Sequence, residues 1–250
     1  MVWALFEILA FVLGNVRMQR PAIIVMTKVP GFADVKTRLR PLLSESQSEE
    51  LAKCFLTDTI TNLASVFEHR IIAFTPEDGR DGIETLVGGH IYIPQRGGDL
   101  GQRLDAVIAE AFEMGFRPVI VIGADSPTLP PDHLAQALDH LRSREDGVAV
   151  GPTNDGGFYL IGISRLHKGM FDGVTWSSDK TCEQTVANIK NICDVDLLVL
   201  PRWYDVDEPA DLVHMIAEID SDEAARDRAR TTSRWITANR KTFVSAFRES

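Results

Sequence analysis

The sequence predicts an α/β fold of three layers, in which helices cover both faces of a mostly parallel sheet. Short apolar runs rich in branched residues alternate along the 250-residue chain with longer segments whose apolar residues recur at helical spacing. The runs at 22–27 (AIIVMT) and 119–122 (VIVI) show no polar alternation, as expected of strands buried on both faces. No internal repeat or low-complexity linker interrupts this order, so residues 18–221 are expected to form one domain.

The individual elements follow from apolar spacing and from residues that begin helices. The helix at 46–66 is expected to start with a capping box of Ser46 and Glu49, and the helix at 132–141 with Asp132 as its N-cap. Residues 222–250 are set apart, with one amphipathic helix predicted at 224–247. The strands are predicted at 22–27, 70–74, 90–93, 119–122, 148–150, 158–163 and 197–200, and the remaining helices at 100–114, 180–189 and 209–219.

The first 17 residues begin with an apolar run, MVWALFEILAFVL. The run is shorter than the ~20 residues that a membrane-spanning helix needs, and it lacks the basic start and cleavage site of a secretory signal. Three interpretations stay open: a helix on a membrane surface, a helix docked on the domain or a partner, or translated sequence upstream of a true start near Met18. The third is favoured.

Charge and cysteine content limit the function classes. The chain has 26 Lys and Arg against 36 Asp and Glu residues, a formal net charge of −10, which argues against nucleic acid as the partner. Cys54, Cys182 and Cys193 are scattered without metal-ligand spacing, which is typical of reduced thiols in a cytoplasmic protein. Neither the P-loop nor the Rossmann glycine pattern is present, because Pro30, Val35 and Arg96 stand where glycines are required.

Basic residues follow the first predicted strand, at the end where ligands bind in such sheets. Lys28, Lys36 and Arg38 surround Gly31 and Thr37 in one loop. Three cations there suit the phosphate groups of a nucleotide, with lysine as a point charge and arginine as a planar fork. The alternative is a solvated loop whose charges bind nothing.

Acidic residues follow two other strands. Asp125 comes directly after the strand at 119–122, and Asp205 and Asp207 alternate along an extended segment before Pro209. Carboxylates at strand ends can hold a hard cation such as Mg²⁺ or Mn²⁺, with water and phosphate oxygens as the other ligands. A turn at Asp125 and helix capping at Asp207 are the alternatives.

Two glycine-rich segments are further candidates. The segment before the helix at 100–114 could bind phosphate or ribose through free amides, or could only begin the helix with Asp99 as N-cap. The turn Asp155-Gly156-Gly157 could face an acceptor, with Asp155 as a weak candidate base. Trp176 could line the acceptor pocket or belong to the core. The nucleotide-binding candidates of the first segment are Gln95, Gly98, Asp99, Gly101 and Arg103.

Five motifs in order resemble the DUF2064 family over residues 22–212. This family consists of GT-A-fold, nucleotide-diphospho-sugar-transferase-like proteins. It is similar to phospholactate guanylyltransferases and, more remotely, to molybdenum-cofactor guanylyltransferases. The motifs are K-x-P-G-x-x-x-V-K-T-R-L at 28–39, GDLGQR at 98–103, GADSP at 123–127, GPTNDGGFYLIG at 151–162 and DVDEPADL at 205–212.

The resemblance implies roles for particular residues. Asp125 matches the metal aspartate that follows the central strand, and Asp207 matches the second acidic position of related nucleotidyltransferases. The Asp-x-Asp of a typical glycosyltransferase is absent, because Ser126 and Pro127 follow Asp125.

Three functions are therefore compared. The first is a metal-dependent glycosyltransferase with a nucleotide-sugar donor, of a kind that some relatives associate with arsenosugar synthesis. The alternative is a guanylyltransferase-like nucleotidyltransferase that joins a nucleoside triphosphate to a small phosphorylated acceptor and releases pyrophosphate, which three cations favour on electrostatic grounds. The third is a non-catalytic nucleotide-binding protein. In either enzyme Lys36, Arg38, Asp125 and Asp155 are the catalytic candidates, and Gly156, Gly157 and Trp176 the acceptor-binding ones.

Overall fold

The computed structural model describes residues 19–192 and 194–246. The prediction for residues 1–17 lies outside this part of the chain. Within it, no helix is both long enough and apolar enough to span a bilayer.

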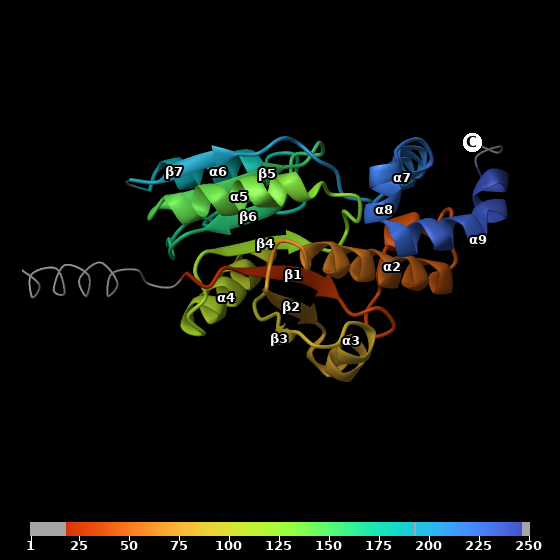
Figure 1. Ribbon diagram of the computed structural model, residues 1–250, viewed down its shortest axis with the longest axis horizontal. Helices are drawn as coiled ribbons and strands as arrows, with labels where there is room; N and C mark the ends of the chain where they lie inside the picture. Colours follow the sequence, from red (N-terminus) through yellow and green to blue (C-terminus); the bar gives the residue numbers. More distant parts are fainter. Residues whose placement is uncertain (1–18, 193, 247–250) are drawn as a thin grey trace, which may run out of the picture.

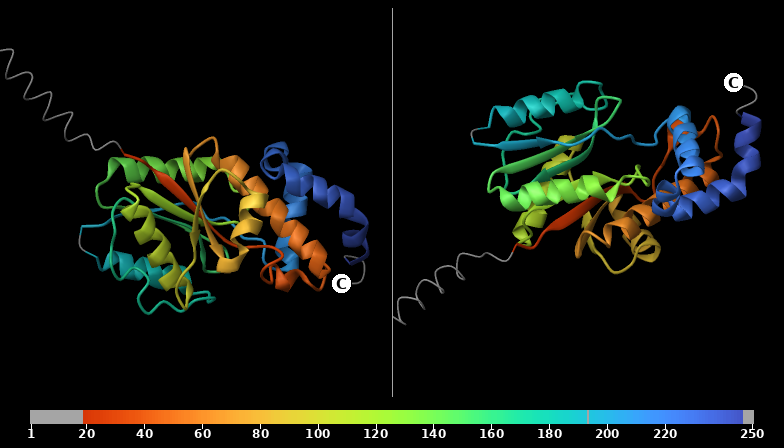
Figure 2. Two further views of the ribbon diagram at one scale, coloured as in Figure 1. Left: turned by 90° about the horizontal axis from the view of Figure 1, so that it is seen from below. Right: turned by 45° about the horizontal axis from the view of Figure 1, so that its top comes forward.

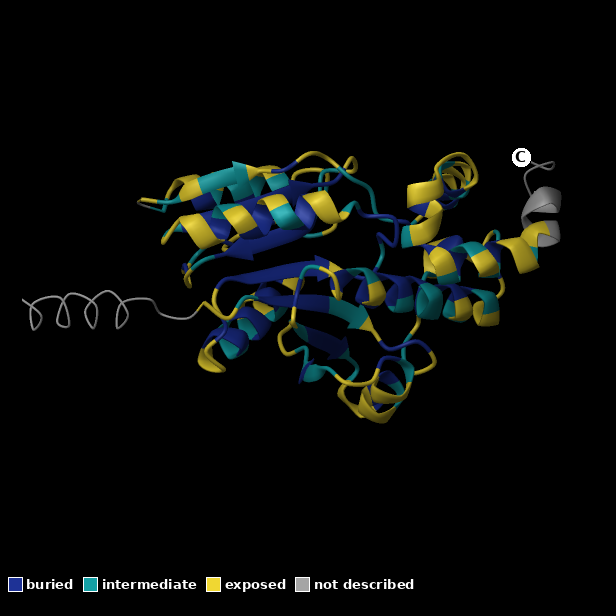
Figure 3. Ribbon diagram, in the orientation of Figure 1, coloured by how far each residue is buried: buried dark blue, intermediate teal, exposed yellow. Residues whose placement is uncertain are grey.

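A seven-stranded sheet forms the middle layer, in the order β3-β2-β1-β4-β6-β5-β7 (Figure 1). Strand β6 runs antiparallel to its neighbours β4 and β5, and the other pairs are parallel. Strand β1 buries its first four residues completely, as its unbroken apolar run predicts (Figure 3). The strands are β1 (Ala22–Lys28), β2 (His69–Thr75), β3 (Ile91–Pro94), β4 (Val119–Gly123), β5 (Gly147–Pro152), β6 (Phe158–Ile163) and β7 (Asp196–Val199).

Helices cover both faces of the sheet, so the predicted three layers are present. One core cluster joins α2 (Glu45–Leu63), α3 (Arg80–Leu86) and α5 (Pro131–Ser143) to one face. A second cluster joins α4 (Leu100–Glu113) and α6 (Thr181–Lys190) to the other face. Helices α7 (Pro209–Ser221), α8 (Glu223–Arg228) and α9 (Arg230–Ala246) lie together at one end of the molecule, beside α2 (Figures 1 and 2).

Three predictions about helix ends are wrong. The N-cap of helix α2 lies two residues earlier than expected, since Ser44 and Gln47 form the capping box instead of Ser46 and Glu49. Helix α5 begins at Pro131, where the fixed φ of proline suits the first turn, so Asp132 lies inside the helix. The predicted single C-terminal helix is divided at Ala229, whose backbone (φ −102°, ψ 45°) is not helical.

Three short elements were not predicted from the sequence. They are α3 and two 3₁₀ turns, η1 (Thr37–Leu39) and η2 (Glu77–Gly79). Each is seven residues or fewer, too short for a helical period to stand out. The turn η1 follows Lys36 directly, and Lys36 is its N-cap.

Candidate functional site

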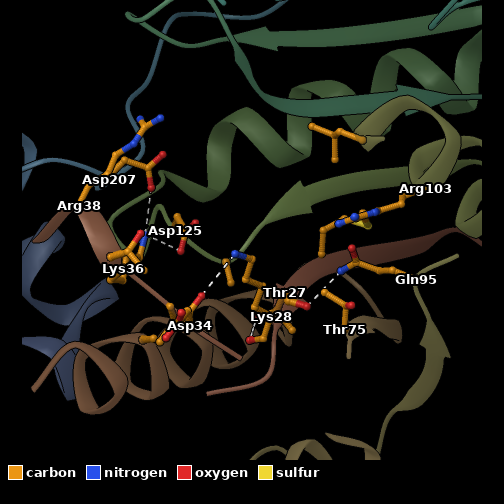
Figure 4. A pocket seen from close by; sticks show the side chains of 16 residues that line it. Thr27, Lys28, Asp34, Lys36, Arg38, Thr75, Gln95, Arg103, Asp125 and Asp207 are labelled. Atoms are coloured by element: carbon orange, nitrogen blue, oxygen red, sulfur yellow. Dashed lines mark hydrogen bonds and ion pairs between the residues drawn. The ribbon is translucent and has the colours of Figure 1, made fainter. Parts of the chain in front are cut away.

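A cavity of about 310 Å³ opens where β1, β2, β3 and β4 end (Figure 4). This is the edge of the sheet at which the carboxyl ends of the parallel strands meet, and so the expected ligand position. Its lining is Met26, Thr27, Lys28, Asp34, Val35, Lys36, Thr37, Arg38, Ala52, Thr75, Gln95, Leu100, Arg103, Ala124, Asp125 and Asp207.

Lys36 forms the centre of the charged end of this cavity. Its Nζ lies 2.7 Å from Asp125 Oδ1 and 3.3 Å from Asp207 Oδ1, and it donates to the carbonyl oxygen of Val206 at 2.7 Å. The Lys36 side chain is 4% exposed, whereas those of Asp125 and Asp207 are 46% and 49% exposed. The two carboxylates therefore meet at one buried ammonium and still face the cavity.

The chain holds Lys36 in an uncommon backbone conformation. Its φ of 48° and ψ of 37° lie in the left-handed region, which non-glycine residues rarely adopt. The ring of Phe55 lies 5.3 Å from Nζ and excludes water on that side. Burial acts to lower the pKa of Lys36, but the charges of Asp125 and Asp207 outweigh it and hold the pKa above its usual value. The ammonium is thus kept charged.

Hydrogen bonds join the two acidic loops to each other. Val206 N donates to the carbonyl oxygen of Asp125 at 2.9 Å. Ser126 Oγ lies 2.9 Å from the carbonyl oxygen of Tyr204 and 2.5 Å from Asp205 Oδ1. Burial and then the charges of Asp125 and Asp207 raise the pKa of Asp205 to about 7, against the effects of Ser126 and Lys36. Asp205 thus serves to join the loops, and its neighbours carry the charge that faces the cavity.

The capping alternative for Asp207 is not realised. The backbone amides of Asp207 and Glu208 donate to Asp211 Oδ2 at 3.1 and 2.8 Å, so Asp211 serves the start of α7. The Asp207 carboxylate is left to contact Lys36. Asp125 likewise directs its carboxylate to Lys36.

Three more predicted cations line the cavity. Lys28 Nζ donates to the carbonyl oxygen of Asp34 at 3.3 Å, and Arg38 lies 3.7 Å from Glu208 while staying 65% exposed. Arg103 reaches the carbonyl oxygen of Gly97 at 3.4 Å. These weak or solvent-exposed contacts leave the three side chains available to an anion.

Gln95 forms part of the cavity wall and holds two strand ends together. Its Nε2 donates to the carbonyl oxygens of Thr27 and Ala73 at 3.0 and 2.7 Å, which ties the ends of β1 and β2 together. Two carbonyl partners fix which amide atom is nitrogen. In the part of the chain that the structure describes, no protein donor reaches its Oε1.

Half of the predicted site residues do not line the cavity. Asp99 is the N-cap of α4 and accepts from Gln102 N at 2.8 Å, and Gly98 N donates to Gln102 Oε1 at 2.8 Å, so both serve the helix start. A Cβ at Gly101 would lie 2.7 Å from Trp176, which itself packs 6.1 Å from the ring of Phe171. The predicted residues outside the lining are Gly31, Gly98, Asp99, Gly101, Asp155, Gly156, Gly157 and Trp176.

The turn at 155–157 is explained by contacts within the chain. Asp155 Oδ1 accepts from Gly157 N at 3.1 Å and from the hydroxyl of Thr153. Gly156 has φ 93°, and a Cβ there would lie 2.1 Å from the carbonyl oxygen of Asp179. The turn and close backbone approach therefore account for these three residues without an acceptor.

Eight residues that line the cavity were not predicted from the sequence: Met26, Thr27, Asp34, Val35, Ala52, Thr75, Leu100 and Ala124. Position at the end of a strand could have suggested Thr75, the last residue of β2, whereas nothing in the pattern distinguishes Asp34 from other loop acids.

The acidic pair suits one kind of cation. No cluster of three or more His, Cys, Asp or Glu residues able to hold a metal occurs in the described ranges 19–192 and 194–246. Mg²⁺ is often held by one or two carboxylates, with water and substrate phosphates completing its shell. Asp125 and Asp207 fit an ion that arrives with phosphate ligands, and they do not form a complete protein cage.

Comparison with known proteins shows what this chain resembles. Residues 59–178 match the model of DUF2064, described as "Uncharacterized protein conserved in bacteria". The predicted resemblance to the DUF2064 family is confirmed. The chain is 26% identical to 2-phospho-L-lactate guanylyltransferase of Methanosarcina mazei, over 78% of this chain and 86% of that protein. It is 30% identical to phosphoenolpyruvate guanylyltransferase of Mycolicibacterium smegmatis, over 48% of this chain and 54% of that protein.

Solved structures that resemble this chain are also described as transferases. A "putative nucleotide-diphospho-sugar transferase" from Desulfovibrio desulfuricans G20 superposes with a TM-score of 0.82 and 27% identity, over 92% of this chain and 99% of that one. A cytidylyltransferase from Leptospira borgpetersenii shares the fold alone, with a TM-score of 0.54, 14% identity and coverage of 90% and 97%. The predicted fold class and the prediction of a transferase are confirmed. The relatives are nucleotidyltransferase-like, which favours the predicted alternative over sugar transfer.

Proposed function

We propose that this protein is a divalent-cation-dependent nucleotidyltransferase that joins a nucleoside triphosphate to a small phosphorylated acceptor and releases pyrophosphate. The observation that carries the proposal is one cavity lined by both the carboxylate pair, Asp125 and Asp207, and the cations Lys28, Arg38 and Arg103. A triphosphate with a bound divalent cation needs carboxylates to hold the cation and positively charged side chains to neutralise the remaining phosphate charge. The guanylyltransferase relatives support the same assignment, and their names give phosphorylated carboxylic acids as acceptors.

The reaction needs little acid–base chemistry from the protein. A phosphate oxygen of the acceptor attacks the α-phosphorus and forms a new P–O bond. The bond from the α-phosphorus to the oxygen bridging to the β-phosphate breaks, and pyrophosphate leaves with the electron pair. The attacking phosphate is already an anion, so no general base is required, which agrees with the involvement of Asp155 in its own turn.

The residues of the cavity have distinct parts in this proposal. Asp125 and Asp207 would hold Mg²⁺ or Mn²⁺, which supplies charge stabilisation at the transferring phosphates. Lys28 and Arg38 neutralise the charge that develops on the leaving pyrophosphate. Gln95 and Arg103 line the cavity at the far side from Lys36 and are positioned for the nucleoside (Figure 4).

A second candidate is transfer of a sugar from a nucleotide-diphospho-sugar donor. The specific observation in its favour is the 0.82 TM-score with the Desulfovibrio structure, over nearly the whole of both chains. In that reaction a nucleoside diphosphate leaves instead of pyrophosphate.

The deciding experiment offers the two donor classes separately. The protein is incubated with each nucleoside triphosphate or each nucleotide sugar, with Mg²⁺ or Mn²⁺, and with 2-phospholactate or phosphoenolpyruvate as acceptor. Formation of pyrophosphate that depends on acceptor supports nucleotidyl transfer, and release of nucleoside diphosphate from a nucleotide sugar supports sugar transfer. Tight nucleotide binding with neither product supports the non-catalytic alternative.

A further inference from the structure

Lys36 has no free hydrogen-bond donor. An ammonium group carries three N–H bonds, and three acceptors surround this one: Asp125 Oδ1 at 2.7 Å, the Val206 carbonyl at 2.7 Å and Asp207 Oδ1 at 3.3 Å. Its side chain is 4% exposed and lies against Phe55. To contact a phosphate oxygen, Lys36 must release one of the acceptors it now holds.

We propose that Lys36 is the resident counter-ion of the Asp125–Asp207 pair, and that it makes the site select a cation already bound to nucleotide phosphates over a bare divalent cation. This inference rests on the proposed function, because it takes the carboxylate pair as the cation site.

The charges explain the selection. Asp125 and Asp207 together carry two negative charges, and the ammonium between them already compensates one. A bare dication must approach that ammonium or force it away, and a displaced Lys36 would be left charged in a buried place without partners. A dication that arrives with a triphosphate brings phosphate oxygens, which are new acceptors for the displaced ammonium. The exchange then leaves every charge paired.

The backbone keeps the ammonium in reach of both partners. Lys36 sits at a left-handed backbone position immediately before η1, so its side chain leaves the loop toward Asp125 and the segment 206–207. Lys28 lines the same cavity, but its Nζ contacts the carbonyl oxygen of Asp34 and neither of the two carboxylates. It therefore provides a matched control that removes one positive charge from the cavity without removing the counter-ion.

The test measures Mn²⁺ binding to the nucleotide-free full chain, by the electron paramagnetic resonance signal of free Mn²⁺. We expect weak binding to the wild-type chain and at least about tenfold tighter binding to Lys36→Met, because a close positive charge has been removed from the cation site. Lys28→Met should change the affinity by less than about threefold, since its charge lies beyond the first contacts. Lys36→Arg, which keeps the charge, should remain weak.

The melting temperature gives a second readout that needs no active enzyme. Mn²⁺ alone should leave the wild-type melting temperature unchanged and raise that of Lys36→Met, whereas Mn²⁺ with a non-hydrolysable triphosphate should raise that of the wild type. If Lys36→Met does not fold, Mn²⁺ binding to Lys36→Gln and the wild-type melting temperatures with and without nucleotide still test the inference.

Two results would overturn the inference. One is equal or weaker Mn²⁺ binding by a folded Lys36→Met or Lys36→Gln, which would make Lys36 a structural pin only. The other is a wild-type melting temperature that rises as much with Mn²⁺ alone as with Mn²⁺ and nucleotide. Failure of the proposed function is seen separately, as the absence of acceptor-dependent pyrophosphate.

Discussion

At the scale of residues, the site depends on contacts between positions far apart in the sequence. Lys36 and Asp207 are 171 positions apart, and Asp125 lies between them. Strands β1 and β4 pair in parallel with Met26 opposite Gly123, so the loops after them leave the sheet at the same edge. Hydrogen bonds from Ser126 and Val206 then fix the third loop against the second. The charged constellation is therefore a consequence of topology.

The first prediction concerns the carboxylates. Asp125→Asn and Asp207→Asn should each lower acceptor-dependent pyrophosphate formation by about 100-fold or more, because each removes a charge that holds the cation at the transferring phosphates. Asp132→Asn, on the exposed first turn of α5, is the control and should keep full activity. Activity of Asp125→Asn within tenfold of the wild type would contradict the assignment.

A second prediction at this scale concerns pH. Burial lowers the pKa of His133, which is 8% exposed and lies 3.0 Å from the hydroxyl of Tyr159 through Nδ1. The folded state therefore keeps the neutral ring while the unfolded chain takes up a proton near pH 6.5, so this stabilisation is complete above pH 6.5 and is lost as the pH falls toward the folded pKa.

The measurement is the melting temperature of the wild type and of His133→Phe from pH 7.5 to pH 5. The phenylalanine keeps a ring but cannot titrate, so its melting temperature should fall less over that range. Other titrating groups are common to both chains and cancel in the difference. Parallel curves for the two proteins would show that His133 does not carry this pH dependence.

The charged residues of the candidate site were predictable from the sequence, together with Gln95 and Arg103 of its walls, but the apolar part of the lining was not. Lys28, Lys36, Arg38, Asp125 and Asp207 follow strands, and parallel pairing brings strand ends together whatever the details of packing. The glycines of the two glycine-rich segments lie outside the cavity lining, because a missing side chain serves equally for a ligand and for close packing. At Gly101 the neighbour is Trp176 and at Gly156 it is Asp179, which no local pattern could reveal.

At the scale of elements, helix ends show where local signals are ambiguous. Ser44 and Ser46 both precede the apolar residues of α2, and each is followed three residues later by Gln47 or Glu49. The structure uses Ser44, whose hydroxyl accepts from Gln47 N at 3.2 Å while Gln47 Oε1 accepts from Ser44 N at 3.0 Å.

The two serines form a matched pair of tests. Ser44→Ala should lower the free energy of unfolding by about 1 kcal/mol, since a helix amide loses its partner. Ser46→Ala lies inside the helix on an exposed position and should change it by less than about 0.5 kcal/mol. Urea denaturation of both variants measures this, and a larger loss for Ser46→Ala would restore the capping box expected from the sequence.

The main elements of the fold were predictable because their signals are long. Buried strands are unbroken apolar runs, and α4 keeps a clear helical period over 14 residues. The short helix α3 and the break at Ala229 were not predicted, because seven residues are too few to show a helical period and no glycine or proline marks the break.

At the scale of the whole molecule, the C-terminal helices are connected to the site. One hydrophobic cluster contains Leu39 from the basic loop, Val206 from the acidic loop and Ile236 from α9. Asp58 on α2 also accepts from the backbone amides of Thr231 and Thr232 at 2.8 Å each, which anchors the start of α9. Helix α9 therefore packs against the same hydrophobic cluster that holds residues of both charged loops.

The last prediction uses this arrangement. Ile236→Ala should lower the free energy of unfolding by about 2–4 kcal/mol, because it opens a cavity in the cluster that holds Leu39 and Val206. Ile189→Ala is the matched control, since Ile189 is equally buried but packs in the cluster on the other face of the sheet. At a temperature where both variants are fully folded, Ile236→Ala should raise the KM for nucleotide several-fold and Ile189→Ala should not. Equal KM values for two variants of equal stability would mean that the C-terminal helices support the fold without positioning Lys36 and Asp207.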